Sequence, residues 1–257
     1  MANTGRTVSK YTRLYGGTAA FGLDLSADTT AFGEIGLDAD FTENAAYSWE
    51  VKGGILGFVT QALGPINQVL NSDGTTLAHD KLAAVQGTLV TLMLALGIRE
   101  APTYGTDIVG GQWELKSYVS DLSDGMVTVN MQLAKRAGVI NYPKFFGKLL
   151  HPLGAETAAN TGKINVVNNG AATTAGGYLV YCVTALDAGT VAVSVDDSAD
   201  NITYGALSGA TSGALAAPAA GIVQLGTTAT VKQYLRFQVA LAGGASTATF
   251  ALGFVRG

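Results

Sequence analysis

The sequence predicts a mainly β protein: a β-sandwich with one flanking short helix, followed by a small immunoglobulin-like β-sandwich. Three observations support this fold class. Apolar and polar residues alternate in many short stretches, which is the period of a strand with one buried face. Glycine accounts for 34 of 257 residues, roughly twice the usual share, and punctuates these stretches. In the first half of the chain, only residues 77–86 have the spacing of a helix.

In the first 150 residues, strands are expected in five stretches: 8–17, 47–63, 87–98, 107–122 and 125–136. Strict alternation divides the fourth stretch between two faces, one with Trp113, Leu115 and Val119, the other with Gln112, Glu114, Lys116 and Tyr118. The Ser-Asp-Gly turn at 123–125 joins it to the fifth as a hairpin. Residues 64–80 are polar and rich in turn residues, which favours a long loop.

The composition changes near residue 150 and becomes very poor in charge. We therefore predict a first domain over 1–150, a linker over 151–162 and a second domain over 163–257. Short alternating strands recur in the second domain, as in a small sandwich: 163–168, 177–187, 189–197, 201–209, 221–241 and 246–257. Asp196 and Asp197 are interpreted as turn residues and not as a carboxylate pair.

Charged residues make up 13% of the chain, about half the globular average, and the net charge is −4. Such a chain lacks the basic stripe of a sequence-specific DNA-binding protein. Its longest apolar run, 89–98, is half the length of a membrane span, and the N-terminus has no pattern of a secretory signal. We expect a soluble chain that buries its uncharged surface against copies of itself or a partner.

The sequence contains no motif typical of a catalytic, metal-binding or phosphate-binding site. His79 and His151 are far apart, and no nucleophile motif accompanies either of them. One cysteine and two histidines are too few for a metal site, and Cys182 lies in an apolar strand as a buried thiol. The glycine pairs are not followed by the Lys-Ser or Lys-Thr of a phosphate loop. We predict no catalytic residue, no cofactor and no metal, and therefore no enzyme.

Several segments resemble the major tail proteins of siphophages, which form the tail tube. The N-terminal "MANTGRTVSKYTRLYGG" and "DLSADTTAFGEIGLD" are similar to the family's opening segment. Residues 97–133 are similar in layout to its final hairpin. The C-terminal "SADNITYGALSGAT" and "VKQYLRFQVAL" look like the accessory β-sandwich appended to many of these proteins.

The resemblance implies a tail-tube-type sandwich over 1–150 and an accessory domain over 163–257. It implies hexameric rings that self-assemble and stack into a tube, contacts with other tail proteins, and DNA that passes through during ejection without specific binding. It also implies a place in the virion, with assembly in the host cytoplasm, and no membrane partner.

One polar face is the candidate functional surface. Alternation in residues 125–136 separates Thr128, Asn130 and Gln132 from Val127, Val129, Met131 and Leu133. A DNA conduit should not grip phosphates, so a neutral face suits its lumen. The candidate lumen-facing residues are Glu114, Lys116, Thr128, Asn130 and Gln132; a solvated or subunit-covered face is the alternative.

The competing functions are a capsid decoration or other virion-surface protein, and a glycan-binding module in the C-terminal half. The glycan reading is weakened by Tyr178, Tyr181, Tyr204 and Tyr234, whose apolar neighbours predict burial.

Overall fold

The computed structural model describes residues 11–33, 35–44, 53–69, 78–97, 100–123, 126–134, 146–157 and 165–257. Within these ranges the fold is mainly β with one short helix, as predicted. The first nine strands and the helix are β1 (Arg13–Thr18), β2 (Phe21–Asp24), β3 (Thr29–Phe32), β4 (Ile35–Asn44), β5 (Gly53–Leu63), β6 (Ile66–Val69), α1 (Ala78–Ala84), β7 (Leu89–Ala95), β8 (Asp107–Ser123) and β9 (Met126–Ala134).

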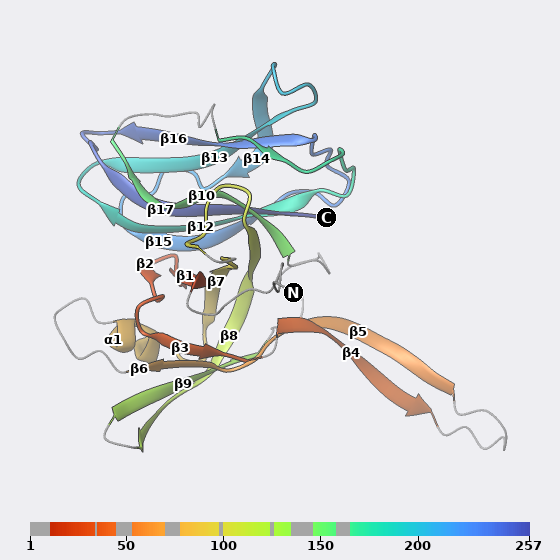
Figure 1. The fold of residues 1–257 in the computed structure, drawn as a ribbon, viewed down its shortest axis with the longest axis vertical. Coiled ribbons are helices and arrows are strands. Elements are labelled where there is room, and N and C mark those ends of the chain that lie inside the picture. The colour runs from red at the N-terminus through yellow and green to blue at the C-terminus, as the bar shows by residue number, and fades with distance from the viewer. Residues whose placement is uncertain are drawn as a thin grey trace, which may run out of the picture.

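The remaining strands are β10 (Phe146–Glu156), β11 (Val167–Asn168), β12 (Gly177–Leu186), β13 (Thr190–Ser198), β14 (Gly205–Thr211), β15 (Ala219–Gln224), β16 (Tyr234–Ala242) and β17 (Ala248–Arg256). They build a sandwich at the top of the molecule (Figure 1). One layer is β15-β12-β17-β10 and the other is β11-β16-β13-β14. Alternate residues of the two layers, among them Val193, Phe237 and Phe250, form its core.

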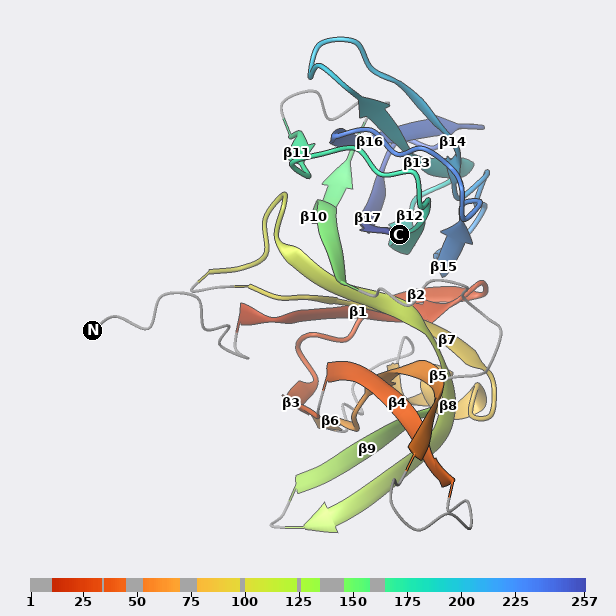
Figure 2. The ribbon, with the colours of Figure 1, turned by 90° about the vertical axis from the view of Figure 1, so that its right-hand side faces the viewer.

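A second layered unit lies below the sandwich (Figure 2). Strand β8 runs through it, pairing with β7 over one stretch and with β9 over the next. Strands β3 and β6 extend the sheet beyond β9, and α1 packs Leu82 into the same core as Trp113 and Ile66. Strands β4 and β5 form a separate hairpin that projects to the side (Figure 1).

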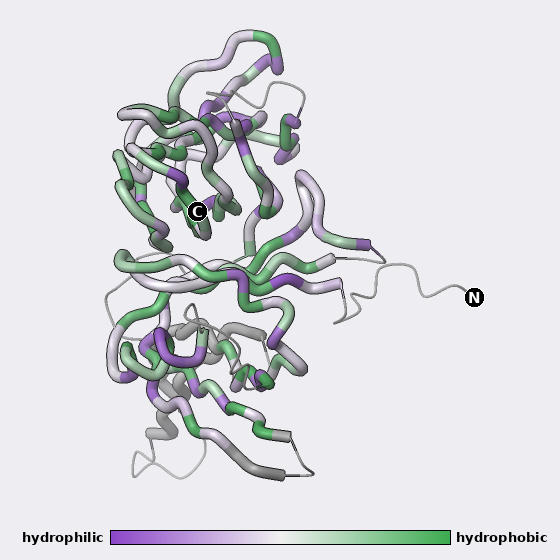
Figure 3. The backbone as a smooth tube through the Cα atoms, turned by 90° about the vertical axis from the view of Figure 1, so that its left-hand side faces the viewer, coloured by the Kyte–Doolittle hydropathy of each residue, from purple (hydrophilic) through white to green (hydrophobic). Residues whose placement is uncertain are grey.

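The two units share a third core, which we call the seam. Its sandwich side consists of Leu149, Tyr178, Val180, Cys182, Ala220, Ala251 and Val255, and its other side of Tyr15, Met93, Ala95 and Ile108. The Tyr178 hydroxyl donates a hydrogen bond to the Gly110 carbonyl across the seam (2.7 Å). Apolar stretches occur in both units, in green in Figure 3. Strand β12 is buried on both faces because of the seam, which explains its unbroken apolar run.

Glycines let the backbones approach closely at the seam. A Cβ atom on Gly22 would collide with the Val183 carbonyl, and one on Gly253 would collide with Ile108. Gly110 would place a Cβ 2.9 Å from the Val180 side chain. Part of the high glycine content thus reflects close packing between the two units and not only turns.

Strand β10 covers residues 146–156, so half of the expected linker lies within a strand. It pairs with β17 of the sandwich and with β8 of the lower unit, which makes one sheet of eleven strands continuous through both. Residues 158–162 of the expected linker lie outside the described residues. The division into 1–150 and 163–257 stays a prediction.

Of two further expectations, the structure confirms the short helix and corrects the long loop. The helix expected over 77–86 is confirmed as α1. The loop expected over 64–80 is wrong at its start, because Ile66–Val69 forms β6 between β3 and β9. Ile66 and Gln68 are buried on its inner face, and the polar sequence concealed this short alternation. The described residues contain no helix with the length and apolar character needed to cross a membrane.

Candidate functional site

Strands β3, β6, β9 and the second half of β8 form a four-stranded strip with one buried and one outward face. Val129 and Met131 of β9 point inward, at 1% and 0% exposure. Thr128, Asn130 and Gln132 alternate with them and point outward, as the sequence predicts. The strip therefore carries a polar face on the side away from its core.

The cross-strand register brings further residues to this polar face. Glu114 lies opposite Ala134, and Ser117 lies opposite Gln132. The Asn130 side-chain amide donates a hydrogen bond to the Asn67 side-chain oxygen (2.7 Å) on the neighbouring strand β6. Asn67 was missed because its segment was expected to be a loop. A cross-strand amide pair of this kind fixes the register of the two strands.

A β-bulge in β8 changes which side chains face outward. The register shifts between Leu115 and Ser117, so Lys116 is the extra residue of the bulge and is exposed. Beyond the bulge the alternation is inverted. Tyr118 points inward against the core, and Val119 points outward with 57% exposure. The sequence expectation for these two residues is therefore wrong, because strict alternation does not allow for a bulge.

The environment of Tyr118 confirms its inward position. Its ring lies 5.1 Å from the His79 ring of α1. Burial, with smaller contributions from the Asp28 and Asp80 carboxylates, raises the pKa of Tyr118 to about 12. The hydroxyl is therefore neutral throughout the physiological range. This places His79 as a packing residue beside the sheet.

The five candidate residues come together in part. Glu114 and Lys116 lie on β8, and Thr128, Asn130 and Gln132 lie on the adjacent strand β9. Alternation and register place Glu114, Thr128, Asn130 and Gln132 on the outward face, and Lys116 is exposed as the unpaired residue of the bulge. They present one carboxylate and one ammonium group, so the face carries no excess of positive charge. Whether this face lines a lumen stays a prediction.

The strip is open along both sides in the described part of the chain. Strand β3 pairs with β6 alone. Strand β7 accompanies β8 only as far as Glu114, after which Gly87 and Thr88 contact the backbone of Leu115. From Ser117 onward β8 pairs with β9 on one side only. Two open edges on opposite sides of a strip leave backbone groups ready to pair with other chains.

His151, the second histidine, is buried in the sandwich core. Its Nε2 atom lies 3.0 Å from the Glu156 carboxylate and its Nδ1 atom 3.2 Å from the Phe250 carbonyl. The ring stacks on Phe250 with centroids 4.3 Å apart. Burial lowers the pKa of His151, while the hydrogen bond to the Glu156 carboxylate opposes this effect. No serine or cysteine among the described residues is bonded to the ring, so the geometry is that of a packed core histidine.

The two aspartates expected in a turn lie instead in β13, where both are buried. Asp196 accepts hydrogen bonds from Arg236, at 2.8 Å from its Nη2 atom, and from Gln238 at 2.7 Å. Asp197 pairs with the Lys232 ammonium at 3.2 Å. The turn lies just after the end of β13, where the Asp200 carboxylate accepts hydrogen bonds from the backbone N–H groups of Ile202 and Thr203. Each buried carboxylate thus has its own cation, as burial requires.

Burial accounts for the remaining residues singled out from the sequence. Cys182 is 1% exposed at the seam, and burial raises its thiol pKa to about 12, so it is an inert thiol as predicted. Tyr178 and Tyr181 are buried, also as predicted. Tyr204 and Tyr234 are only half-buried, and the Tyr204 ring faces the Arg236 guanidinium at 4.0 Å.

No protein-family model and no curated protein matches this chain. Among solved structures, the SPP1 Dit protein, described as a paradigm of the hub adsorption apparatus in phages that infect Gram-positive bacteria, has a TM-score of 0.30 and 12% identity over 95% of this chain and 99% of its own. A chain of the phage P2 baseplate in its activated conformation with Ca has a TM-score of 0.32 and 12% identity over 94% and 97%. The corresponding structure with Sr gives 0.31 and 10% identity over the same shares.

Proposed function

We propose that the chain is a structural subunit of a phage tail, and more specifically that it forms hexameric rings that stack into the tail tube. The observation that carries the proposal is the strip with two open edges and a neutral polar outward face. The resemblance of the N-terminal segments and of residues 97–133 to major tail proteins supports it, and supplies the expected six-fold symmetry.

The open edges give a route to ring closure. The free edge of β8 from Ser117 onward in one subunit can pair with β3 of the next subunit. Such a contact joins two different surfaces, so it repeats around a ring until the rotation closes. Pairing would also remove the edges that an isolated strip exposes to aggregation.

The polar face then has a role in the ring. With β3, β6, β9 and β8 joined edge to edge, the outward faces of all subunits form one continuous wall. Asn67, Asn130 and Gln132 offer this wall amides instead of ammonium or guanidinium groups. DNA phosphates passing along it would release few counterions, so the DNA would not be held. We therefore assign the face to the lumen.

Electron microscopy of the purified full-length chain tests the proposal. Rings or tubes are expected at high protein concentration without any added metal or cofactor. A matched pair of variants tests the edge: Ala31→Lys places a charge on the exposed edge strand β3, and Ser208→Lys places the same charge on an exposed sandwich strand. Ala31→Lys should reduce ring formation and Ser208→Lys should not.

A monodisperse monomer in the unmodified protein at all concentrations would contradict the ring proposal. Trimers without tubes would instead favour a capsid decoration or another virion-surface protein. Equal ring formation by both variants would mean that β3 is not the pairing edge.

A further inference from the structure

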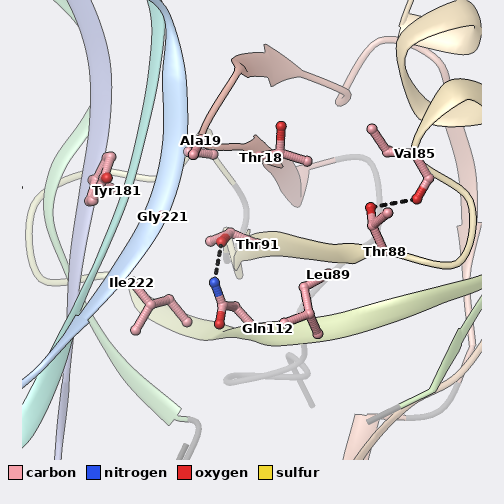
Figure 4. Close-up of a pocket in the computed structure, with 11 residues that line it drawn as sticks. Thr18, Ala19, Val85, Thr88, Leu89, Thr91, Gln112, Tyr181, Gly221 and Ile222 are labelled. Atoms are coloured by element: carbon pink, nitrogen blue, oxygen red, sulfur yellow. Dashed lines mark hydrogen bonds between the residues drawn. The ribbon is translucent and has the colours of Figure 1, made fainter. Parts of the chain in front are cut away.

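A pocket of about 490 Å³ opens between the sandwich and the lower unit (Figure 4). The lower unit contributes the turn between β1 and β2, the segment after α1, and strands β7 and β8. The sandwich contributes β12 and β15. Pockets of this size at the junction of two folded units are the usual place for small ligands.

The polar groups of the pocket are hydroxyls and one amide, from Thr18, Thr88, Thr91, Gln112 and Tyr181. Thr91 is 2% exposed, and its hydroxyl accepts a hydrogen bond from the Gln112 amide at 3.3 Å. The Thr88 hydroxyl donates to the Val85 carbonyl at 2.6 Å (Figure 4). Three of the groups, those of Thr88, Thr91 and Gln112, are thus held in place by the protein itself.

Tyr181 differs from its neighbours because its hydroxyl has no hydrogen-bond partner among the described residues, although the residue is only 8% exposed. The hydroxyl lies over Gly221, where a Cβ atom would approach it to 2.5 Å. Glycine at 221 therefore leaves the hydroxyl room at the pocket wall. The hydroxyl oxygen is not among the buried unsatisfied atoms of the described residues, so it is open to the pocket and can bond water or a ligand there.

None of the residues that line the pocket is charged. A carboxylate, phosphate or ammonium ligand would lose its hydration there without gaining an opposite charge. Val85, Leu89 and Ile222 supply apolar wall between the polar groups. A ligand that suits this lining has several hydroxyls, apolar C–H faces and no charge.

We propose that the seam pocket binds one neutral sugar ring, with the Tyr181 hydroxyl as a direct hydrogen-bond partner. The proposal does not depend on ring assembly, because every lining residue belongs to one subunit. The ring could be a free monosaccharide or the terminal unit of a surface glycan, which share the same chemistry.

Saturation-transfer NMR and calorimetry on the full-length chain test this, with glucose, galactose, a neutral tetrasaccharide, and the charged analogues glucosamine and glucuronate. A neutral sugar should bind with a Kd of about 1 mM, the range of weak small ligands, and the charged analogues should bind at least about tenfold more weakly. Binding of the tetrasaccharide as well as the monosaccharide identifies a glycan terminus, and binding of the monosaccharide alone identifies a free sugar.

Three variants locate the site. Ala19→Trp fills the pocket mouth and should abolish binding, whereas Ala20→Trp, on the neighbouring exposed residue that does not line the pocket, should leave it unchanged. Tyr181→Phe removes only the hydroxyl and should weaken binding about fivefold. Absence of binding by every neutral sugar, or full binding by Ala19→Trp, would overturn the proposal.

Discussion

At the scale of single residues, His151 makes the sandwich core sensitive to acid. Both ring nitrogens face acceptors, the Glu156 carboxylate and the Phe250 carbonyl, inside an aromatic cluster. Burial lowers the pKa of His151 below its usual 6.5, so the unfolded chain binds a proton more readily than the folded one. Stability is therefore full above pH 6.5 and decreases as the pH falls below it.

The variant Glu156→Gln should enlarge this acid sensitivity. Glu156 raises the pKa of His151 through its hydrogen bond and its charge, and the neutral amide removes the charge. The melting temperature should fall by about 2–4 °C more at pH 5 than at pH 8, relative to the unmodified protein. His151→Phe serves as the control, since it removes the titrating group. An identical pH dependence in Glu156→Gln and the unmodified protein would refute the coupling.

Gly22 tests the close packing of the seam. Its Cβ position is blocked by the carbonyl oxygens of Val183 and Ala219, which are backbone atoms that cannot rotate away. Gly22→Ala should therefore lower the free energy of unfolding by about 2 kcal/mol. Gly205→Ala is the matched control, because no atom lies within 4 Å of its Cβ position. Urea unfolding measures both, and equal midpoints would show that the seam is not tightly packed.

At the scale of elements, β8 shows where sequence reasoning succeeds and fails. Its alternation before the bulge correctly assigned Trp113 and Leu115 to the core. After the bulge the assignment is inverted, since one extra residue exchanges the faces of all that follow. Nothing in the local sequence distinguishes a bulged Lys116 from an ordinary outward lysine.

A pair of alanine variants measures this inversion. Tyr118→Ala should lower the free energy of unfolding by about 2 kcal/mol, because the ring packs against the core and His79. Val119→Ala should change it by less than about 0.5 kcal/mol, because the side chain is mostly exposed. Chemical denaturation decides between the two assignments. The opposite order of effects would restore strict alternation through residue 119.

At the scale of the whole molecule, the sequence predicted two β-rich parts but not how they join. The outward polar residues of β9 followed directly from period-two alternation. The seam did not, because an apolar strand buried between two layers has the same sequence as one buried in a single core. Tyr178 and Val180 pack in the seam, and Leu179 packs in the sandwich core. The Tyr181 ring also packs in the sandwich core, while its hydroxyl passes over Gly221 to the pocket. Likewise, the seam pocket needs residues far apart in sequence, so no local motif indicated it.

The lumen assignment leads to a prediction for infection. Gln132→Lys adds a ring of ammonium groups to the proposed wall, at an exposed position that leaves the core intact. Tubes should form normally, while DNA ejection slows, and the slowing should weaken at higher salt. Ser208→Lys carries the same charge on the sandwich and should eject DNA normally. Ejection measured in vitro from phage carrying each variant distinguishes them; unchanged kinetics in Gln132→Lys would remove the face from the lumen.

The continuity of β17, β10 and β8 has a mechanical consequence. Strand β10 is hydrogen-bonded to β17 of the sandwich on one side and to β8 of the lower unit on the other. A pulling force applied to the sandwich is therefore transmitted through backbone hydrogen bonds to the sheet of the lower unit. The glycine-lined contact also restricts relative movement of the two units, because backbone atoms of one pack directly against backbone atoms of the other. In a tube built from such subunits, torsion and bending of the outer surface would be transmitted to the wall of the channel, because the two units of each subunit are rigidly coupled.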